Sequence, residues 1–385
     1  MTSSALRVGL VAPRFAPFHG GVETYVASAA SALAAEGADV TVITQAPRSA
    51  GLPQHEVLDG YTIERHRLPI GAILDVPSLP AARAASRAGR FDVVWAHSYH
   101  TPLAWLVAEQ TTTPLVFAPH YHGVGHTPLR HALHTAYRPA GRRLMAASKR
   151  VVAVTEAEAS LLLRDFPGEI PREKLAVIPT AVPDPVHGRQ SFPGTANVVL
   201  TVARQEPYKR TDLLIRAVAE LKRRGVPAHL VVVGDGSGLA DCRRLATDLG
   251  AGDVVTFTGS VDDETLGRWW ASASVYATAS QQEAYGIGLA QALVAGLPVV
   301  ASDIPAHREL VSRAGPAAAA RLGAVAEDAD GAEAGALFAD AIAEQLSTTA
   351  SRSERAQRCT LPRTADMVRQ LVDTLTAASA MVSLS

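Results

Sequence analysis

The sequence predicts an α/β protein built from two doubly wound parallel-sheet domains in tandem. Short, continuous apolar runs alternate with helical patterns, which is typical of strands buried on both faces of a parallel sheet. This alternation occurs twice, and the proline-rich stretch 180–195 lies between the two series like a linker. The length of 385 residues also suits about two domains. Since such sheets bind ligands at the carboxyl ends of their strands, we expect a site in a cleft that the two domains face.

The first series opens with a strand, a loop rich in Gly and Pro, and a helix over 22–36 that ends at Gly37. Further apolar runs continue the alternation. The strands predicted for this domain are 7–13, 39–44, 61–66, 91–96, 114–118, 151–155 and 175–179.

The second series has the same character, and its predicted strands are 197–203, 229–233, 254–258, 275–277 and 298–301. The section 313–335 is rich in Ala and Gly, and no pattern assigns it to a helix or a strand. A helical pattern over 364–378 finishes the chain.

Composition excludes several classes of protein. Lys and Arg total 36 and Asp and Glu total 37, so the net charge of −1 gives no global field for nucleic acid or an anionic membrane. The two cysteines, Cys242 and Cys359, lie far apart, which excludes a disulfide framework, a Cys-rich zinc site and an iron–sulfur cluster. No signal peptide and no run of ~18 apolar residues is present, so we expect a cytoplasmic protein.

Two glycine-rich turns each precede a helix and could approach a phosphate. Gly20 and Gly21 follow the first strand, next to His19, and paired glycines let the backbone come close to a ligand at a helix N-terminus. Gly234 opens a second such turn after strand 229–233, but its spacing is not that of the dinucleotide fingerprint. Ordinary strand–helix turns use glycine in the same way, so both interpretations stay open.

Arg204 and Lys209 form a pair of cations just after the first strand of the second domain. Two cations on a strand-to-helix loop can clamp a diphosphate and stabilise the charge that develops on a phosphate leaving group. A solvated, charged loop would have the same sequence, so the function remains a hypothesis.

A carboxylate, a glycine-rich turn and an apolar helix follow one another over 280–296. Glu283 precedes the turn, and the free N–H groups of the helix start can hold phosphate oxygens. Glu283 could bond sugar hydroxyls, and Gln291 lies about two turns into the helix. A capped helix with a satisfied Glu is the alternative.

Histidines gather in the first domain, at His97, His100, His120, His122, His126, His131 and His134. Apart from His120-x-His122 their spacing matches no metal site, and polar lining or surface positions explain most of them. His120 differs because it follows strand 114–118, at the end where active-site residues of parallel sheets collect. The pair Asp328 and Asp330 lies in an Ala- and Gly-rich segment and is interpreted as solvated surface, so no metal and no cofactor is expected.

These features, in this order, resemble retaining glycosyltransferases of family 4, whose GT-B fold has two Rossmann-like domains. The resemblance covers nearly the whole chain, through GGVETYV, GADVTVIT, FDVVWAHS and VVAVTEAE, and is most specific in VVVGDGS, VTFTGSV and EAYGIGLAQALVAGLPVVASD. It implies a nucleotide-sugar donor held mainly by a domain over 189–364. The acceptor would lie mainly against a domain over 1–188, to which 365–385 would cross back.

The resemblance also implies roles for single residues. His120 would lie beside the transferred sugar, Arg204 and Lys209 on the diphosphate, and Glu283 near the donor sugar, as the first Glu of a Glu-x7-Glu motif. The residues implied to contact the rest of the donor are Gly20, Gly21, Gly234, Val261, Tyr285, Gly286, Ile287, Gly288 and Gln291.

The chain departs from the family pattern in a few places. Gln291 replaces the second Glu of the motif, which is expected to hold the ribose, and Ala203 and Arg210 replace glycines beside the cationic pair. The family's IPNGVD reads IPTAVPD here. A neutral amide can still bond one hydroxyl as an acceptor and another as a donor. The implied mechanism retains the anomeric configuration, with no protein nucleophile and with the departing diphosphate as the base.

We therefore expect a hexosyltransferase that uses a UDP- or GDP-sugar and a small soluble acceptor, such as a sugar, cyclitol or secondary metabolite. The Ala- and Arg-rich composition is typical of GC-rich bacterial genomes. The alternatives are an epimerase or phosphorylase of the same fold, and a nucleotide-sugar-binding partner subunit impaired by Gln291. A lipid- or polysaccharide-directed transferase at a membrane surface is a further alternative, because basic residues are frequent over 126–150. Pro139 and Gly141 would interrupt an amphipathic helix there, which disfavours it.

Overall fold

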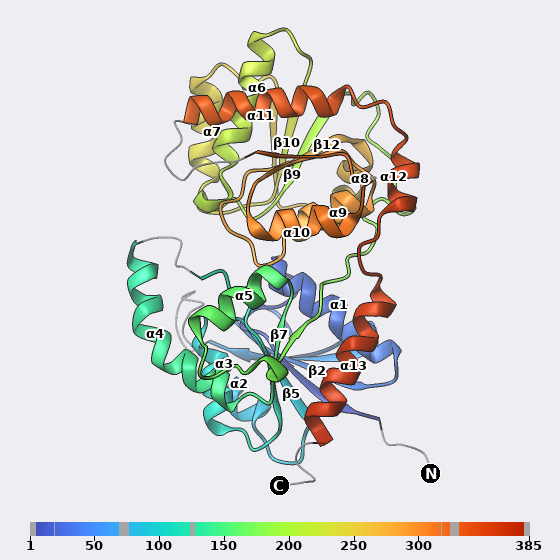
Figure 1. Cartoon of the computed structure of the whole chain (residues 1–385). Coiled ribbons are helices and arrows are strands. Elements are labelled where there is room, and N and C mark those ends of the chain that lie inside the picture. The colour runs from blue at the N-terminus through green and yellow to red at the C-terminus, as the bar shows by residue number, and fades with distance from the viewer. Residues whose placement is uncertain are drawn as a thin grey trace. The chain divides into compact units, whose positions relative to one another are not determined.

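The computed structural model describes residues 5–18, 20–68, 77–123, 128–316, 318–323 and 331–380, without the side chains of 128–134. The chain divides into two units, Met1–Ala181 with Pro362–Ser385, and Val182–Leu361. Each unit is a sheet with helices packed against it (Figure 1). The division falls inside the proline-rich stretch, which contains no helix or strand. The terminal helix α13 (Thr364–Ala380) belongs to the first unit.

The strands of the first unit lie in the order β3-β4-β2-β1-β5-β6-β7-β8. They pair in parallel in the part that the structure describes, apart from β3 and β4, which form an antiparallel hairpin at the edge. The bounds are β1 (Arg7–Val11), β2 (Asp39–Ala46), β3 (His55–Leu58), β4 (Tyr61–Arg67), β5 (Val93–His97), β6 (Leu115–Ala118), β7 (Arg150–Ala153) and β8 (Leu175–Val177).

Successive residues of β5 face opposite layers of helices. Trp95 packs edge-on against Tyr25 of α1 (Gly21–Ala35), with ring centroids 5.8 Å apart. Val94 and Ala96 belong instead to a buried core with residues from the other helices. These helices are α2 (Leu79–Ala85), α3 (Pro102–Gln110), α4 (Pro128–Ala147) and α5 (Glu156–Asp165), and α13 packs against α1, β5 and β6. Burial on both faces explains the continuous apolar run and confirms a doubly wound unit.

The second unit repeats this architecture, with strands in the order β11-β10-β9-β12-β13-β14, all paired in parallel. The strands are β9 (Val198–Val202), β10 (His229–Val233), β11 (Val255–Gly259), β12 (Ala273–Thr278), β13 (Val299–Ser302) and β14 (Ala320–Gly323). The helices are α6 (Thr211–Arg223), α7 (Leu239–Asp248), α8 (Asp263–Ser272), α9 (Ile287–Val294), α10 (Pro305–Ala314), α11 (Gly331–Leu346) and α12 (Arg352–Arg358). Short 3-10 turns are Arg48–Ala50, Arg172–Lys174 and Pro207–Lys209.

All predicted strands are present, with ends that differ by a few residues. The sequence pattern did not predict β3, which is a short edge strand with little burial. It also did not predict β14 and the start of α11, which fall in the unassigned section 313–335. The predicted interruption over 126–150 is wrong, because α4 continues through Pro139 and Gly141. Gly141 is required there by packing, since a Cβ would lie 2.4 Å from the Tyr99 hydroxyl oxygen. No helix in the described ranges is both long and apolar enough to cross a membrane.

Candidate functional site

The sheet order of the second unit brings two loops together. β9 lies between β10 and β12 and pairs in parallel with both, so the loops that leave β9 and β12 are neighbours at the carboxyl edge. The direction of the strand order reverses at this point, and doubly wound sheets bind their ligands there. Arg204 and Lys209 lie on the loop after β9, and Glu283 lies on the loop after β12. The fold therefore assembles residues that are far apart in the sequence.

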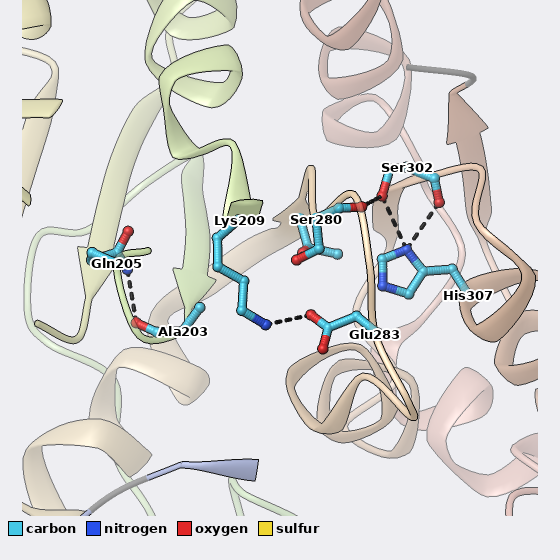
Figure 2. Close-up of polar contacts among 8 residues, drawn as sticks. Ala203, Gln205, Lys209, Ser280, Glu283, Ser302 and His307 are labelled. Carbon is cyan, nitrogen blue, oxygen red and sulfur yellow. Dashed lines mark hydrogen bonds and ion pairs between the residues drawn. The ribbon is translucent and has the colours of Figure 1, made fainter. Parts of the chain in front are cut away.

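Lys209 and Glu283 form an ion pair across these loops (Figure 2). Nζ of Lys209 donates to Oε1 of Glu283 at 2.5 Å, and the two side chains are 13% and 18% exposed. Burial acts to lower the pKa of Lys209, but Glu283 and Tyr208 outweigh it, so the pKa is raised. Burial acts to raise the pKa of Glu283, but the charge of Lys209 outweighs it, so that pKa is lowered. Both groups are therefore charged at neutral pH.

His307, from the start of α10, supports the loop that carries Glu283. Its Nδ1 lies 2.9 Å from the carbonyl oxygen of Ser302, which can only accept, so Nδ1 carries the proton. The Ser302 hydroxyl donates to the carbonyl oxygen of Ser280 at 2.5 Å and so ties the loop to β13 (Figure 2). Burial lowers the pKa of His307, which keeps the ring neutral. No pattern in the sequence indicated a role for this residue.

The turn after Glu283 requires glycine at two positions. Gly286 has a φ of 99°, in the left-handed region, and precedes α9 without a side-chain cap. A Cβ on Gly288 would lie 2.3 Å from the Tyr276 hydroxyl oxygen. The first N–H groups of α9, from Ile287 onward, have no partner within the helix, which suits an anion.

Tyr285 and Gln291 flank this helix start in different environments. Tyr285 is buried, and burial raises the pKa of its hydroxyl. Gln291 is partly exposed on the second turn of α9. Its exposure is compatible with a ligand contact, and its predicted contact with the ribose stays a prediction.

The loop after β9 is held by a residue that the sequence did not reveal. Gln205 is 1% exposed, and its Nε2 donates to the carbonyl oxygen of Ala203 at 2.8 Å (Figure 2) and to that of Val233 at 3.2 Å. Its Oε1 accepts from the Thr211 hydroxyl at 2.7 Å. Arg204, next to it, is exposed, and its charge acts to lower the pKa of Lys209, so the two cations lie close together.

The glycine-rich turn after β10 packs on this same loop. Gly234 has a φ of 112°, and a Cβ there would lie 2.0 Å from the carbonyl oxygen of Ala203. Close packing therefore accounts for the glycine, and a donor contact of Gly234 stays a prediction. Val261 is partly buried and precedes Asp262, the N-cap of α8, and its implied contact with the donor likewise stays a prediction.

In the first unit, the helix that follows the glycine turn contacts His120 through Tyr25. β1 lies between β2 and β5, and its loop leads to Gly20 and to Gly21, the first residue of α1. One turn further on, the Tyr25 ring packs edge-on against His120, with centroids 5.2 Å apart. The Glu23 carboxylate folds over Gly20 and pairs with Arg14 at 2.5 Å. His19, the other member of the predicted turn, lies outside the described residues.

His120 is held against a second buried histidine. Its Nε2 lies 3.3 Å from Nδ1 of His97, and the two rings are stacked with centroids 5.6 Å apart. Burial lowers the pKa of His120 to about 4. Burial, together with His120, also lowers the pKa of His97 well below its usual value. The pair is therefore uncharged at neutral pH, and His97 fixes the orientation of the His120 ring.

The remaining histidines do not form a metal site in the described part of the chain. His100 and His122 stack on each other, with ring centroids 4.3 Å apart. Among the described residues, no group of three His, Cys, Asp or Glu side chains is placed to hold a metal ion. His126, Asp328, Asp330 and the side chains of His131 and His134 lie outside those residues, so the expected lack of a metal stays a prediction.

Known families and proteins match both units. The family described as Glycosyltransferase Family 4 matches residues 19–184, and Glycosyl transferases group 1 matches residues 185–358. The D-inositol 3-phosphate glycosyltransferase of Streptomyces avermitilis is 31% identical over 345 residues, which are 77% of this chain and 73% of that protein. The protein of the same name from Kineococcus radiotolerans is 31% identical over 353 residues, which are 80% of each chain.

Solved structures show the same fold at low sequence identity. Sucrose-phosphate synthase from Thermosynechococcus elongatus matches with a TM-score of 0.72 at 20% identity, over 98% of this chain and 100% of that chain. HepE from Anabaena, in complex with UDP and glucose, matches with a TM-score of 0.71 at 20% identity, over 97% and 100%. These likenesses confirm the GT-B fold, and the sequence matches show that the chain belongs to glycosyltransferase family 4.

Proposed function

We propose that this glycosyltransferase transfers a hexose, with retention of the anomeric configuration, from a UDP- or GDP-sugar to a small soluble acceptor. The observation that carries the proposal is the Lys209–Glu283 pair beside the start of α9. One cluster of loops thus combines a cation and helix N–H groups, which suit a diphosphate, with a carboxylate, which suits sugar hydroxyls.

The proposed reaction exchanges one bond at C1 of the sugar. The bond from C1 to the diphosphate oxygen breaks, the acceptor oxygen bonds C1 on the same face, and the acceptor proton passes to the departing phosphate. The protein then supplies positioning and charge stabilisation. Lys209 and Arg204 stabilise the charge on the leaving diphosphate, and the N–H groups of 286–288 bond its oxygens. Glu283 orients the sugar hydroxyls.

His120 serves this reaction as a neutral side chain. Since its pKa is lowered to about 4, the ring adds no positive charge beside the transferred sugar. A neutral imidazole can donate at one nitrogen and accept at the other, which suits a sugar hydroxyl. Gly20 and Gly21 would let the backbone at the start of α1 approach the donor closely.

The relatives indicate the class of acceptor. Those of about 30% identity are named for D-inositol 3-phosphate, which supports a phosphorylated or free cyclitol. HepE, a structural neighbour, holds UDP and glucose, which supports a uridine donor. Family membership favours a transferase over a binding subunit. A membrane-directed enzyme would instead transfer the sugar to lipid, and the experiment below compares lipid with small soluble acceptors.

The test is a transfer assay read by mass spectrometry. UDP- and GDP-hexoses are each incubated with the protein and with inositol, D-inositol 3-phosphate or vesicles that contain anionic lipid. We expect acceptor-dependent release of UDP or GDP and the mass of one added hexose on a small acceptor. Transfer to vesicle lipid alone would assign the membrane-directed function instead. Nucleotide binding without any turnover on these or wider acceptor pools would contradict the proposal.

A further inference from the structure

His120 stands in a backbone conformation that needs support. Its φ is 50°, in the left-handed region, where a residue with a side chain is strained. Such a conformation persists only where neighbouring contacts fix it. His97 fixes the ring, through the contact of 3.3 Å between Nδ1 and Nε2, but it does not hold the backbone.

The backbone is held by a buried carboxylate from another element. Oε1 of Glu158, on α5, accepts the N–H of Tyr121, the residue after His120, at 2.6 Å. Its Oε2 accepts the N–H of Val154, at the end of β7, at 2.8 Å. Glu158 is 1% exposed, so water does not compete for these bonds. One side chain thus joins the loops that leave two neighbouring strands, β6 and β7.

The local sequence suggests a simpler role, which the geometry does not support. Thr155 is the N-cap of α5 and accepts the N–H of Glu158 at 2.9 Å, so Glu158 occupies the third helical position of a capping box. In that motif the Glu would bond the N–H of the cap residue itself. Here its two oxygens bond the N–H groups of Val154 and Tyr121 instead, and the bond to Tyr121 reaches the loop after the neighbouring strand β6, which carries His120.

We infer that Glu158 is a positioning residue for sugar transfer, which holds the strained His120 turn in its active geometry through the Tyr121 N–H. The inference rests on the proposed function, because it requires His120 to act on the donor sugar. Displacement of a reacting group by ~1 Å can reduce the rate about 10²-fold, so loss of this bond should reduce turnover. Burial raises the pKa of Glu158 to about 7, while the bonds from the Val154 and Tyr121 N–H groups act to lower it, so these two bonds favour the ionised form that accepts at both oxygens.

The test compares Glu158→Gln and Glu158→Ala with Thr155→Ala, which removes a bond at the same helix start but leaves the acceptor of Tyr121 in place. We expect kcat to fall about tenfold for Glu158→Gln, which keeps one acceptor oxygen, and about 10²-fold for Glu158→Ala. The dissociation constants of UDP and GDP should change less than about twofold in both, since the nucleotide site lies in the second unit. Thr155→Ala should lower the melting temperature but keep kcat within about threefold of wild type.

A double mutant separates positioning from general support of the fold. In a His120→Ala background, Glu158→Gln should cause no further loss of kcat, because the residue through which it acts is gone. An equal loss in both backgrounds would overturn this inference and leave the proposed function standing. Wild-type kcat in Glu158→Gln would also overturn it. If His120→Ala itself had wild-type kcat, the assigned role of His120 would fail together with this inference.

Discussion

Lys209→Ala should lower both kcat and the free energy of unfolding of the second unit, for two different reasons. The substitution removes a charge that we place on the leaving diphosphate, and loss of one preorganised stabiliser typically lowers kcat by about 10²–10³. It also leaves the Glu283 carboxylate, which is only 18% exposed, without its partner at 2.5 Å. Breaking a buried pair in this way costs about 3 kcal/mol, at the low end of the usual range because neither group is fully buried. With Lys209 absent, burial dominates and the pKa of Glu283 rises.

The double variant Lys209→Ala, Glu283→Gln tells the two effects apart. A neutral Gln needs no cation, so most of the lost unfolding free energy should return. The value of kcat stays low, because the diphosphate still lacks its cation and the sugar lacks the Glu283 carboxylate. Lys222→Ala is the matched control, since it breaks a Lys–Asp253 pair on the same unit whose side chains are 42% and 66% exposed. It should cost less than about 1 kcal/mol and leave kcat unchanged. Steady-state transfer and urea unfolding measure both quantities. Wild-type kcat in folded Lys209→Ala would refute the diphosphate assignment.

Three further outcomes follow from the site. His120→Ala should lower kcat while calorimetry shows the affinity for UDP or GDP nearly unchanged, and a large loss of affinity would place His120 at the nucleotide instead. Burial lowers the pKa of His120 from 6.5 to about 4, so the unfolded chain binds more protons than the folded chain between these two pH values. The contribution of His120 to the free energy of unfolding is therefore present above pH 6.5 and is lost as the pH falls to about 4. Wild type should therefore lose up to about 3 kcal/mol more than His120→Ala on acidification, as followed by urea unfolding near pH 7 and near pH 4.5, and equal losses would contradict this. Gln291→Ala should weaken nucleotide binding and Gln291→Glu should stay within about tenfold of wild type, whereas transfer that appeared only in Gln291→Glu would make the natural chain a binding protein.

The apolar strands explain why most of the fold could be predicted. Val94, Trp95 and Ala96 are buried on both faces of the sheet, so their strand is apolar throughout and stands out in the sequence. β3 has no such run, because an edge strand with exposed side chains needs none. The Ala- and Gly-rich residues of β14 and α11 lack the contrast between apolar and polar positions that separates a strand from a helix.

The site residues that directly follow strand ends could be predicted. The residues that bond to a loop distant in the sequence could not. Lys209 and Glu283 could both be proposed from their loops, but their pairing depends on β12 lying beside β9, which a crossover connection determines. Gln205 and His307 bond backbone groups that only the folded chain brings within reach. Glu158 matches a capping motif, so its local sequence indicates a different bond from the one it makes to Tyr121.

The central claim is that the loops after β9 and β12 bind the diphosphate of a nucleotide donor. The most direct test is calorimetric titration of the whole chain with UDP and with uridine, and with GDP and guanosine, in wild type and Lys209→Ala. For the correct base we predict that the diphosphate improves the affinity by at least about 10²-fold in wild type. This gain should shrink by about tenfold or more in Lys209→Ala and persist in Lys222→Ala. Equal affinities of wild type for each nucleotide and its nucleoside, or an undiminished gain in Lys209→Ala, would contradict the account.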